Sequence, residues 1–129
     1  MVQITISEVS KTSKIALIKH GARDWIASHV ADAVAKAESV GNRICGLYYL
    51  ESYCQQLQSG RVNGTVDPVV SNPKGGSVHV DAGMGFAQPA FARGLPIAVD
   101  LARELGVATL AIGHAHTCTS LGYFTEQIA

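Results

Sequence analysis

Cys45 is the residue of this 129-residue chain whose type and position offer the clearest chemistry. The apolar residues that follow it at helical spacing are Leu47, Leu50, Cys54 and Leu57. They predict an amphipathic helix that ends at the left-handed cap glycine Gly60. A thiol at the start of that helix would feel the positive end of the peptide dipoles, which lowers its pKa and favours the thiolate. Cys45 is therefore a candidate catalytic residue, and the competing interpretation is a small buried hydrophobic side chain.

A second stretch with chemical promise is GHAHTCTSLG, residues 113–122, which follows an apolar strand. In extended geometry His114, His116 and Cys118 would point the same way, and such soft ligands could bind zinc. A closed structural site needs a fourth ligand, and no spaced partner is evident, so we assign no metal. The alternative is that this loop, which leads into a helix started by Thr119 or Ser120, offers backbone N–H groups to a cofactor or an anion.

Three motifs of the chain are similar to those of a known family. The first comprises Gly46, Leu50, Tyr53, Leu57 and Gly60, the second is VDAGMGFAQPA at 80–90, and the third is GVATLAIGHAH at 106–116. Together they resemble the malate/L-lactate dehydrogenase family of the type without a Rossmann fold. That family includes ureidoglycolate and sulfolactate dehydrogenases and the reductases of cyclic imino acids, and the second motif looks like the imino-acid branch.

The resemblance implies a set of site residues. Where members carry Ser-His-Gly and a following Arg, this chain has Ile44, Cys45, Gly46 and Tyr49. Cys45 would then take the place of the proton donor, and Tyr49 the place of the residue that holds the substrate carboxylate. The later loop lies near the nicotinamide in the family, which implies cofactor contacts for His116, Thr117 and Thr119.

The function implied is an NAD(P)-dependent oxidoreductase, or the N-terminal fragment of one, with NADPH or NADH as cofactor. Its substrate would be a small 2-oxo, 2-hydroxy or cyclic imino carboxylic acid. The alternative is a non-catalytic relic or interaction domain, since Cys45, Tyr49 and Thr117 all depart from the family pattern. Members are also considerably longer, so we expect a truncated frame, one piece of a split protein or a domain that works alone. If the chain is truncated or is one piece of a split protein, its cofactor site lacks some of its walls. The isolated chain should then not bind NADPH with micromolar affinity.

The elements that must position these residues can be read from periodicity. Apolar and polar residues alternate at 2–6, which predicts a short strand. Three helices are predicted after it: one that ends at Gly21, one from Asp24 to about Gly41, and one that ends at Gly60. A turn-rich connector with an extended piece at 66–70 leads to a strand at 77–81, a helix starting near Pro89, and a strand at 107–112 expected to be buried on both faces. This predicts an α/β chain in which a three-helix region, residues 1–64, precedes a β-α-β-α unit, residues 65–129, that begins the cofactor-binding region.

Composition narrows the partners. Ten acidic and ten basic residues give a net charge of zero without charge runs, which argues against nucleic acid or an anionic membrane as a partner. Three irregularly spaced cysteines indicate a reducing cytoplasm, and no apolar run approaches the ~20 residues that span a bilayer. We therefore expect a small-molecule carboxylic acid substrate, and either a homodimer or association with a missing C-terminal half.

Overall fold

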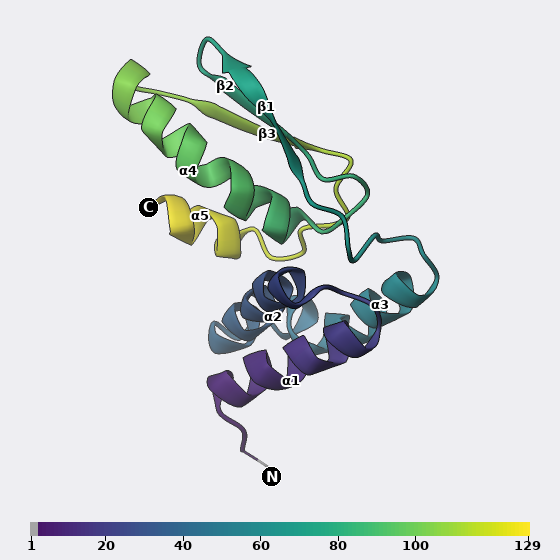
Figure 1. Cartoon of the computed structure of the whole chain (residues 1–129). Helices are drawn as coiled ribbons and strands as arrows, with labels where there is room; N and C mark the ends of the chain where they lie inside the picture. The colour runs from purple at the N-terminus through teal and green to yellow at the C-terminus, as the bar shows by residue number, and fades with distance from the viewer. Residues whose placement is uncertain (1–2) are drawn as a thin grey trace.

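The computed structural model describes residues 3–129, apart from the side chains of residues 72–74. The elements in chain order are α1 (Ile6–Lys19), α2 (Asp24–Ser39), the 3-10 turn η1 (Arg43–Cys45), α3 (Leu47–Gln58), β1 (Val69–Lys74), β2 (Ser77–Asp81), α4 (Ala87–Leu105), β3 (Thr109–Gly113) and α5 (Gly122–Ile128). Figure 1 shows α1, α2 and α3 packed together, with the sheet, α4 and α5 forming a second layer beside them. The predicted α/β class, with a helical N-terminal region, is confirmed.

The first element differs from its prediction. Residues 3–5 form no strand, and α1 begins at Ile6, with Thr5 as its N-cap; Val2 lies outside the described residues. The Thr5 hydroxyl accepts a hydrogen bond from the Glu8 N–H at 3.2 Å, and the Glu8 carboxylate accepts one from the Thr5 N–H at 2.7 Å. This capping box satisfies two backbone donors at once, and it outweighs the β-branched pattern of the segment.

The core of the helical region is built on small residues of α2. Ala27, Val30 and Ala31 are fully buried, which lets α1 and α3 approach closely. Leu17 of α1 and Tyr53 of α3 pack into the same cluster. The apolar stripe predicted for α2 is therefore confirmed. None of the helices in residues 3–129 is long and apolar enough to cross a membrane.

The sheet has the order β1-β2-β3, with β1 antiparallel and β3 parallel to the central strand β2. The extended piece predicted at 66–70 is shifted toward the C-terminus, because β1 runs from Val69 to Lys74. The strand at 107–112 was expected to be buried on both faces, and this is wrong: Leu110 and Ile112 are only half-buried and Thr109 is exposed. The reason is that β3 pairs only with β2 among the described strands, and α4 covers one face of the sheet (Figure 1).

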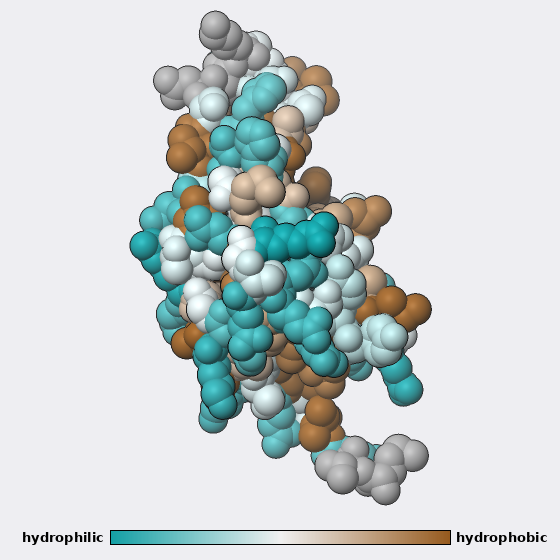
Figure 2. Space-filling model, turned by 90° about the vertical axis from the view of Figure 1, so that its right-hand side faces the viewer, coloured by the Kyte–Doolittle hydropathy of each residue, from teal (hydrophilic) through white to brown (hydrophobic). Residues whose placement is uncertain are grey.

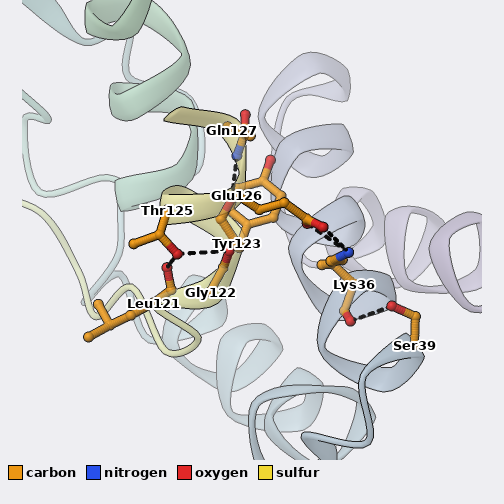
Figure 3. A network of polar contacts seen from close by, with 8 residues as sticks. All are labelled: Lys36, Ser39, Leu121, Gly122, Tyr123, Thr125, Glu126 and Gln127. Atoms are coloured by element: carbon orange, nitrogen blue, oxygen red, sulfur yellow. Dashed lines mark hydrogen bonds and ion pairs between the residues drawn. The ribbon is translucent and has the colours of Figure 1, made fainter. Parts of the chain in front are cut away.

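Helix α5 joins the two layers. Lys36 of α2 and Glu126 of α5 form an ion pair at 2.7 Å, which Figure 3 shows together with the hydrogen bonds at the ends of both helices. On the other side of α5, the Phe124 ring packs edge-on against Phe91 of α4, with 5.0 Å between ring centroids. The helical region and the sheet are thus held together through α5 as well as through α2 and α4.

We expect the isolated chain to self-associate, because the open edge of β3 and the exposed side chains of Leu105 and Val107 offer unpaired backbone and apolar surface. Light scattering across a concentration series should show a mass that rises above that of one chain. A constant monomer mass at high concentration would contradict this expectation. The face in Figure 2 is mostly hydrophilic, with apolar residues in separate patches.

Candidate active site

Cys45 lies where the sequence predicts it, immediately before α3. It is the last residue of η1, and Gly46 is the N-cap of the helix. The carboxylate of Glu38 accepts a hydrogen bond from the Leu47 N–H at 2.8 Å, so an acidic group already occupies the positive end of α3. A Cβ at Gly46 would overlap the Glu38 carboxylate, so the glycine allows this carboxylate to lie against the helix start. The helix start therefore presents a half-buried thiol and a carboxylate together.

The three cysteines differ in access, and we expect iodoacetamide to label Cys54 last. Cys54 is buried on the apolar face of α3, and burial, together with the charge of Glu51, raises the pKa of its thiol. Cys45 and Cys118 are half-buried, and we expect Cys45 to react first because a glycine follows it. Mass-spectrometric mapping of sub-stoichiometric labelling between pH 6 and 9 tests the order. Preferential labelling of Cys118 would mean that Cys45 is a packed residue.

The loop after β3 is held against the loop after β2 by backbone hydrogen bonds. The Met84 N–H donates to the His114 carbonyl and the His116 N–H donates to the Gly85 carbonyl, each at 2.8 Å. Three non-glycine residues in these loops have positive φ: Met84 at 63°, His114 at 49° and Thr119 at 53°. Such conformations are uncommon outside glycine and persist only where the surroundings enforce them.

The two histidines of the loop have different surroundings. His114 is exposed, and its Nδ1 lies 3.2 Å from the Asp81 carboxylate. His116 turns inward, and its ring packs edge-on against Tyr53 and Phe86, with centroids 6.3 and 6.2 Å away. Within residues 3–129, no group of three or more His, Cys, Asp or Glu side chains is placed to hold a metal ion.

Tyr53 is the residue around which the predicted site residues meet. Its side chain is 1% exposed, and its hydroxyl lies 2.9 Å from the Thr119 hydroxyl, 66 residues further along the chain. The Tyr49 ring packs edge-on against Tyr53 at 4.9 Å, one turn earlier on α3. Burial raises the pKa of Tyr53 to about 12, so its hydroxyl stays protonated at neutral pH.

Gln88 is a site residue that the sequence analysis missed. Its side chain is completely buried in the first turn of α4, and its Nε2 lies 3.5 Å from both the Tyr53 hydroxyl and the Cys118 carbonyl. Its Oε1 has no hydrogen-bond partner. An unpaired buried amide oxygen is costly, so it indicates a position retained for more than packing. The available signal was a glutamine inside the otherwise apolar stretch GFAQPA.

His116 has the second unpartnered polar atom of the site. Its Nδ1 is buried without a hydrogen-bond partner, and burial, followed by the positive charge of Arg61, lowers the pKa of its imidazole. Neutral His116 is therefore favoured in the fold, and its contribution to stability is lost as the pH falls below the usual histidine value of about 6.5. Thr117, the next residue, is exposed beside it.

A cavity of 410 Å³ borders this loop between α4, β3 and α5. His116 and Cys118 form part of its wall, and the remaining lining residues are Ala87, Phe91, Ile112, Ala115, Leu121, Phe124 and Thr125. An almost entirely apolar wall with one imidazole at its edge suits a flat organic ring. The structure thus brings His116, Thr119 and Tyr49 together at Tyr53 and leaves His114 outside.

Comparison with known proteins identifies the class. The model of the malate/L-lactate dehydrogenase family matches residues 4–129, and the chain belongs to this family. It is 34% identical over 129 residues to a Δ1-pyrroline-2-carboxylate/Δ1-piperideine-2-carboxylate reductase of Pseudomonas putida, covering 100% of this chain and 38% of that protein. It is 36% identical to the NADP+-dependent (2R)-3-sulfolactate dehydrogenase of Chromohalobacter salexigens, over 98% of this chain and 38% of that one.

Solved structures agree. The fold superposes on Δ1-piperideine-2-carboxylate reductase from Pseudomonas syringae pv. tomato with a TM-score of 0.96 and 32% identity, covering 100% of this chain and 39% of that one. Sulfolactate dehydrogenase from Methanocaldococcus jannaschii has the same fold, with a TM-score of 0.87 at 22% identity. The chain spans less than two-fifths of the length of these proteins, and the resemblance to their N-terminal portion is confirmed.

Proposed function

We propose that this chain forms part of an NAD(P)-dependent oxidoreductase that reduces a small cyclic imino carboxylic acid, or a related 2-oxo or 2-hydroxy acid. The observation that carries the proposal is the contact of α3 with the loop after β3 through the Tyr53–Thr119 hydrogen bond. The relatives from two Pseudomonas species, at 34% and 38% identity, act on Δ1-pyrroline-2-carboxylate and Δ1-piperideine-2-carboxylate by their names, and they favour the imino-acid class.

In this proposal Cys45, just before α3, and Tyr49, in its first turn, both act on the substrate. The thiol of Cys45 holds the proton that passes to the ring nitrogen of the imine as the C=N bond is reduced. The Tyr49 hydroxyl donates a single hydrogen bond to the substrate carboxylate. An arginine would grip that group through two parallel bonds, so Tyr49 favours weaker binding or a smaller substrate.

The nicotinamide fits the residues of the loop. A cavity with almost entirely apolar walls, to which the His116 side chain contributes, matches a flat ring. When bound, NADPH or NADH would supply the hydride. His116 would contact the ring, the exposed Thr117 would offer its hydroxyl to the cofactor, and the half-buried Thr119 would offer its backbone. Neutral His116 suits this place, because an imidazolium would oppose the positive charge of the oxidised nicotinamide.

We further propose the division of the chain and its setting. Residues 1–64 form a helical region that supplies Cys45 and Tyr49, and residues 65–129 begin the cofactor-binding region. The protein works in the cytoplasm, consistent with three free cysteines, and assembles as a homodimer or with a C-terminal half.

The test is an activity assay with the purified chain at millimolar NADPH or NADH. Loss of absorbance at 340 nm should follow addition of Δ1-pyrroline-2-carboxylate or Δ1-piperideine-2-carboxylate, with sulfopyruvate, oxaloacetate and pyruvate as competing substrates. Turnover with an imino acid supports the proposal. Absence of turnover with every substrate, for the chain alone and for the chain mixed with the C-terminal part of the Pseudomonas putida relative, favours the alternative of a relic or interaction domain.

A further inference from the structure

The buried hydroxyl of Tyr53 belongs to a closed ring of hydrogen bonds that joins three parts of the chain. It lies 2.9 Å from the Thr119 hydroxyl, which donates to the Cys118 carbonyl at 2.8 Å. The amide nitrogen of Gln88 closes the ring, since it lies 3.5 Å from both the Cys118 carbonyl and the Tyr53 hydroxyl. The ring thus connects α3, the first turn of α4 and the loop after β3.

Chemistry fixes the direction of every proton in this ring. The Gln88 nitrogen only donates and carries two hydrogens, and the Cys118 carbonyl only accepts. Because the Thr119 hydrogen goes to that carbonyl, the Tyr53 hydroxyl must donate to Thr119 and accept from Gln88. Burial keeps the pKa of Tyr53 at about 12, so this donor is present throughout the neutral range. The ring of hydrogen bonds therefore has one allowed arrangement of protons. Its four contacts restrain the loop against α3 and α4.

The loop needs such a restraint. Thr119 has a φ of 53°, an uncommon conformation for a β-branched residue, and its own hydroxyl supplies two of the ring's contacts. Cys118 and Thr119 directly follow His116 and Thr117, so the hydrogen bonds of Thr119 anchor the C-terminal end of the segment that carries those two residues. Beyond Thr119, Ser120 is buried, and its hydroxyl lies 3.5 Å from the Asn42 amide, close to Cys45 in the chain.

We propose that Tyr53, Gln88 and Thr119 are positioning residues that clamp the His116–Thr117 loop onto α3 and so fix the cofactor side of the site relative to the Cys45 side. The effect of the clamp on cofactor binding rests on the proposed function. The restraint of the loop against α3 rests on the hydrogen bonds alone.

The first experiment measures, without any cofactor, hydrogen exchange of the His116 amide, which donates to the Gly85 carbonyl at 2.8 Å, and of the Thr119 amide, which donates to the Thr117 hydroxyl at 3.4 Å. Tyr53→Phe keeps the aromatic ring of the side chain and removes its hydroxyl. We expect these amides to exchange roughly three- to tenfold faster in this variant. The matched control is Tyr48→Phe on the same helix, where the side chain is 80% exposed and the rates should not change. Thr119→Val should match Tyr53→Phe, and Thr119→Ser, which keeps the hydroxyl, should restore the slow rates.

The second experiment separates positioning from general stability. The double variant Tyr53→Phe/Thr119→Val should accelerate exchange in this segment by less than the product of the two single effects, because the bond between the two hydroxyls is lost in both single variants. In the activity assay, both single variants should raise the KM for NADPH several-fold more than they lower kcat. Unchanged exchange in Tyr53→Phe, or failure of Thr119→Ser to restore it, overturns the clamp. If the unsubstituted chain shows no turnover, the exchange rates alone decide on the clamp, and the proposed function fails separately.

Discussion

Gly94→Val should lower the free energy of unfolding by about 3 kcal/mol, the upper part of the usual range for overpacking a core. A Cβ at this position of α4 would lie 2.5 Å from a methyl carbon of Leu110 and 2.7 Å from one of Val80. Both neighbours belong to the sheet, so the helix would have to move away from β2 and β3. Since small domains are stable by only ~5–15 kcal/mol, this change removes a large part of the total.

The measurement is the urea midpoint of unfolding followed by circular dichroism. Gly113→Ala is the matched control, because a Cβ at the end of β3 would meet nothing within 4 Å and φ is not in the left-handed region. It should leave the midpoint close to that of the unsubstituted chain. Equal midpoints for both variants would mean that α4 does not pack on the sheet through Gly94.

Cys45→Ala should lower kcat for imino acid reduction at least ~100-fold, the low end of what general acid catalysis contributes. Alanine removes the only proton that the proposal places at the start of α3, and it is smaller than cysteine, so the site is not blocked. Cys45→His should keep or raise kcat, because an imidazole holds a proton near neutral pH.

The control for these variants is Tyr48→Phe, which changes an exposed side chain three residues away. Its kcat and KM should equal those of the unsubstituted chain. If Cys45→Ala keeps more than half of the activity, Cys45 is not the proton donor. Glu38, whose carboxylate lies at the same helix start, would then be the next residue to replace.

Sequence periodicity predicted the parts of the fold that depend on local pattern. The stripe through Ile26 and Val30 is buried as expected, and Gly60 and Gly106 have the positive φ of helix caps, at 72° and 85°. The strand predicted at the N-terminus was wrong although the signal against it was present, since Thr5 and Glu8 have the spacing of a capping box.

The burial of β3 depends on its neighbours in space, and a single strand's composition does not reveal them. Val107 to Ile112 is nearly continuous in apolar residues, yet Leu110 and Ile112 are only half-buried, because no described strand lies beyond β3. The same limit applies to the site. Cys45 was found from local pattern, and His116, Thr117 and Thr119 from the resemblance to a family. The contact between Tyr53 and Thr119 joins residues 66 positions apart and follows only from the tertiary fold.

The central claim is that the start of α3 and the loop after β3 form one site, and chemical-shift mapping by NMR tests it most directly. The ¹⁵N-labelled chain is titrated to millimolar concentration with NADPH, and then with pyrrole-2-carboxylate, a flat and non-reducible analogue of the imino acids. NADPH should shift the amides of His116, Thr117 and Thr119, and the analogue should shift those of Cys45 and Tyr49. Shifts confined to surfaces away from both segments, or no shifts at millimolar ligand, would contradict the account.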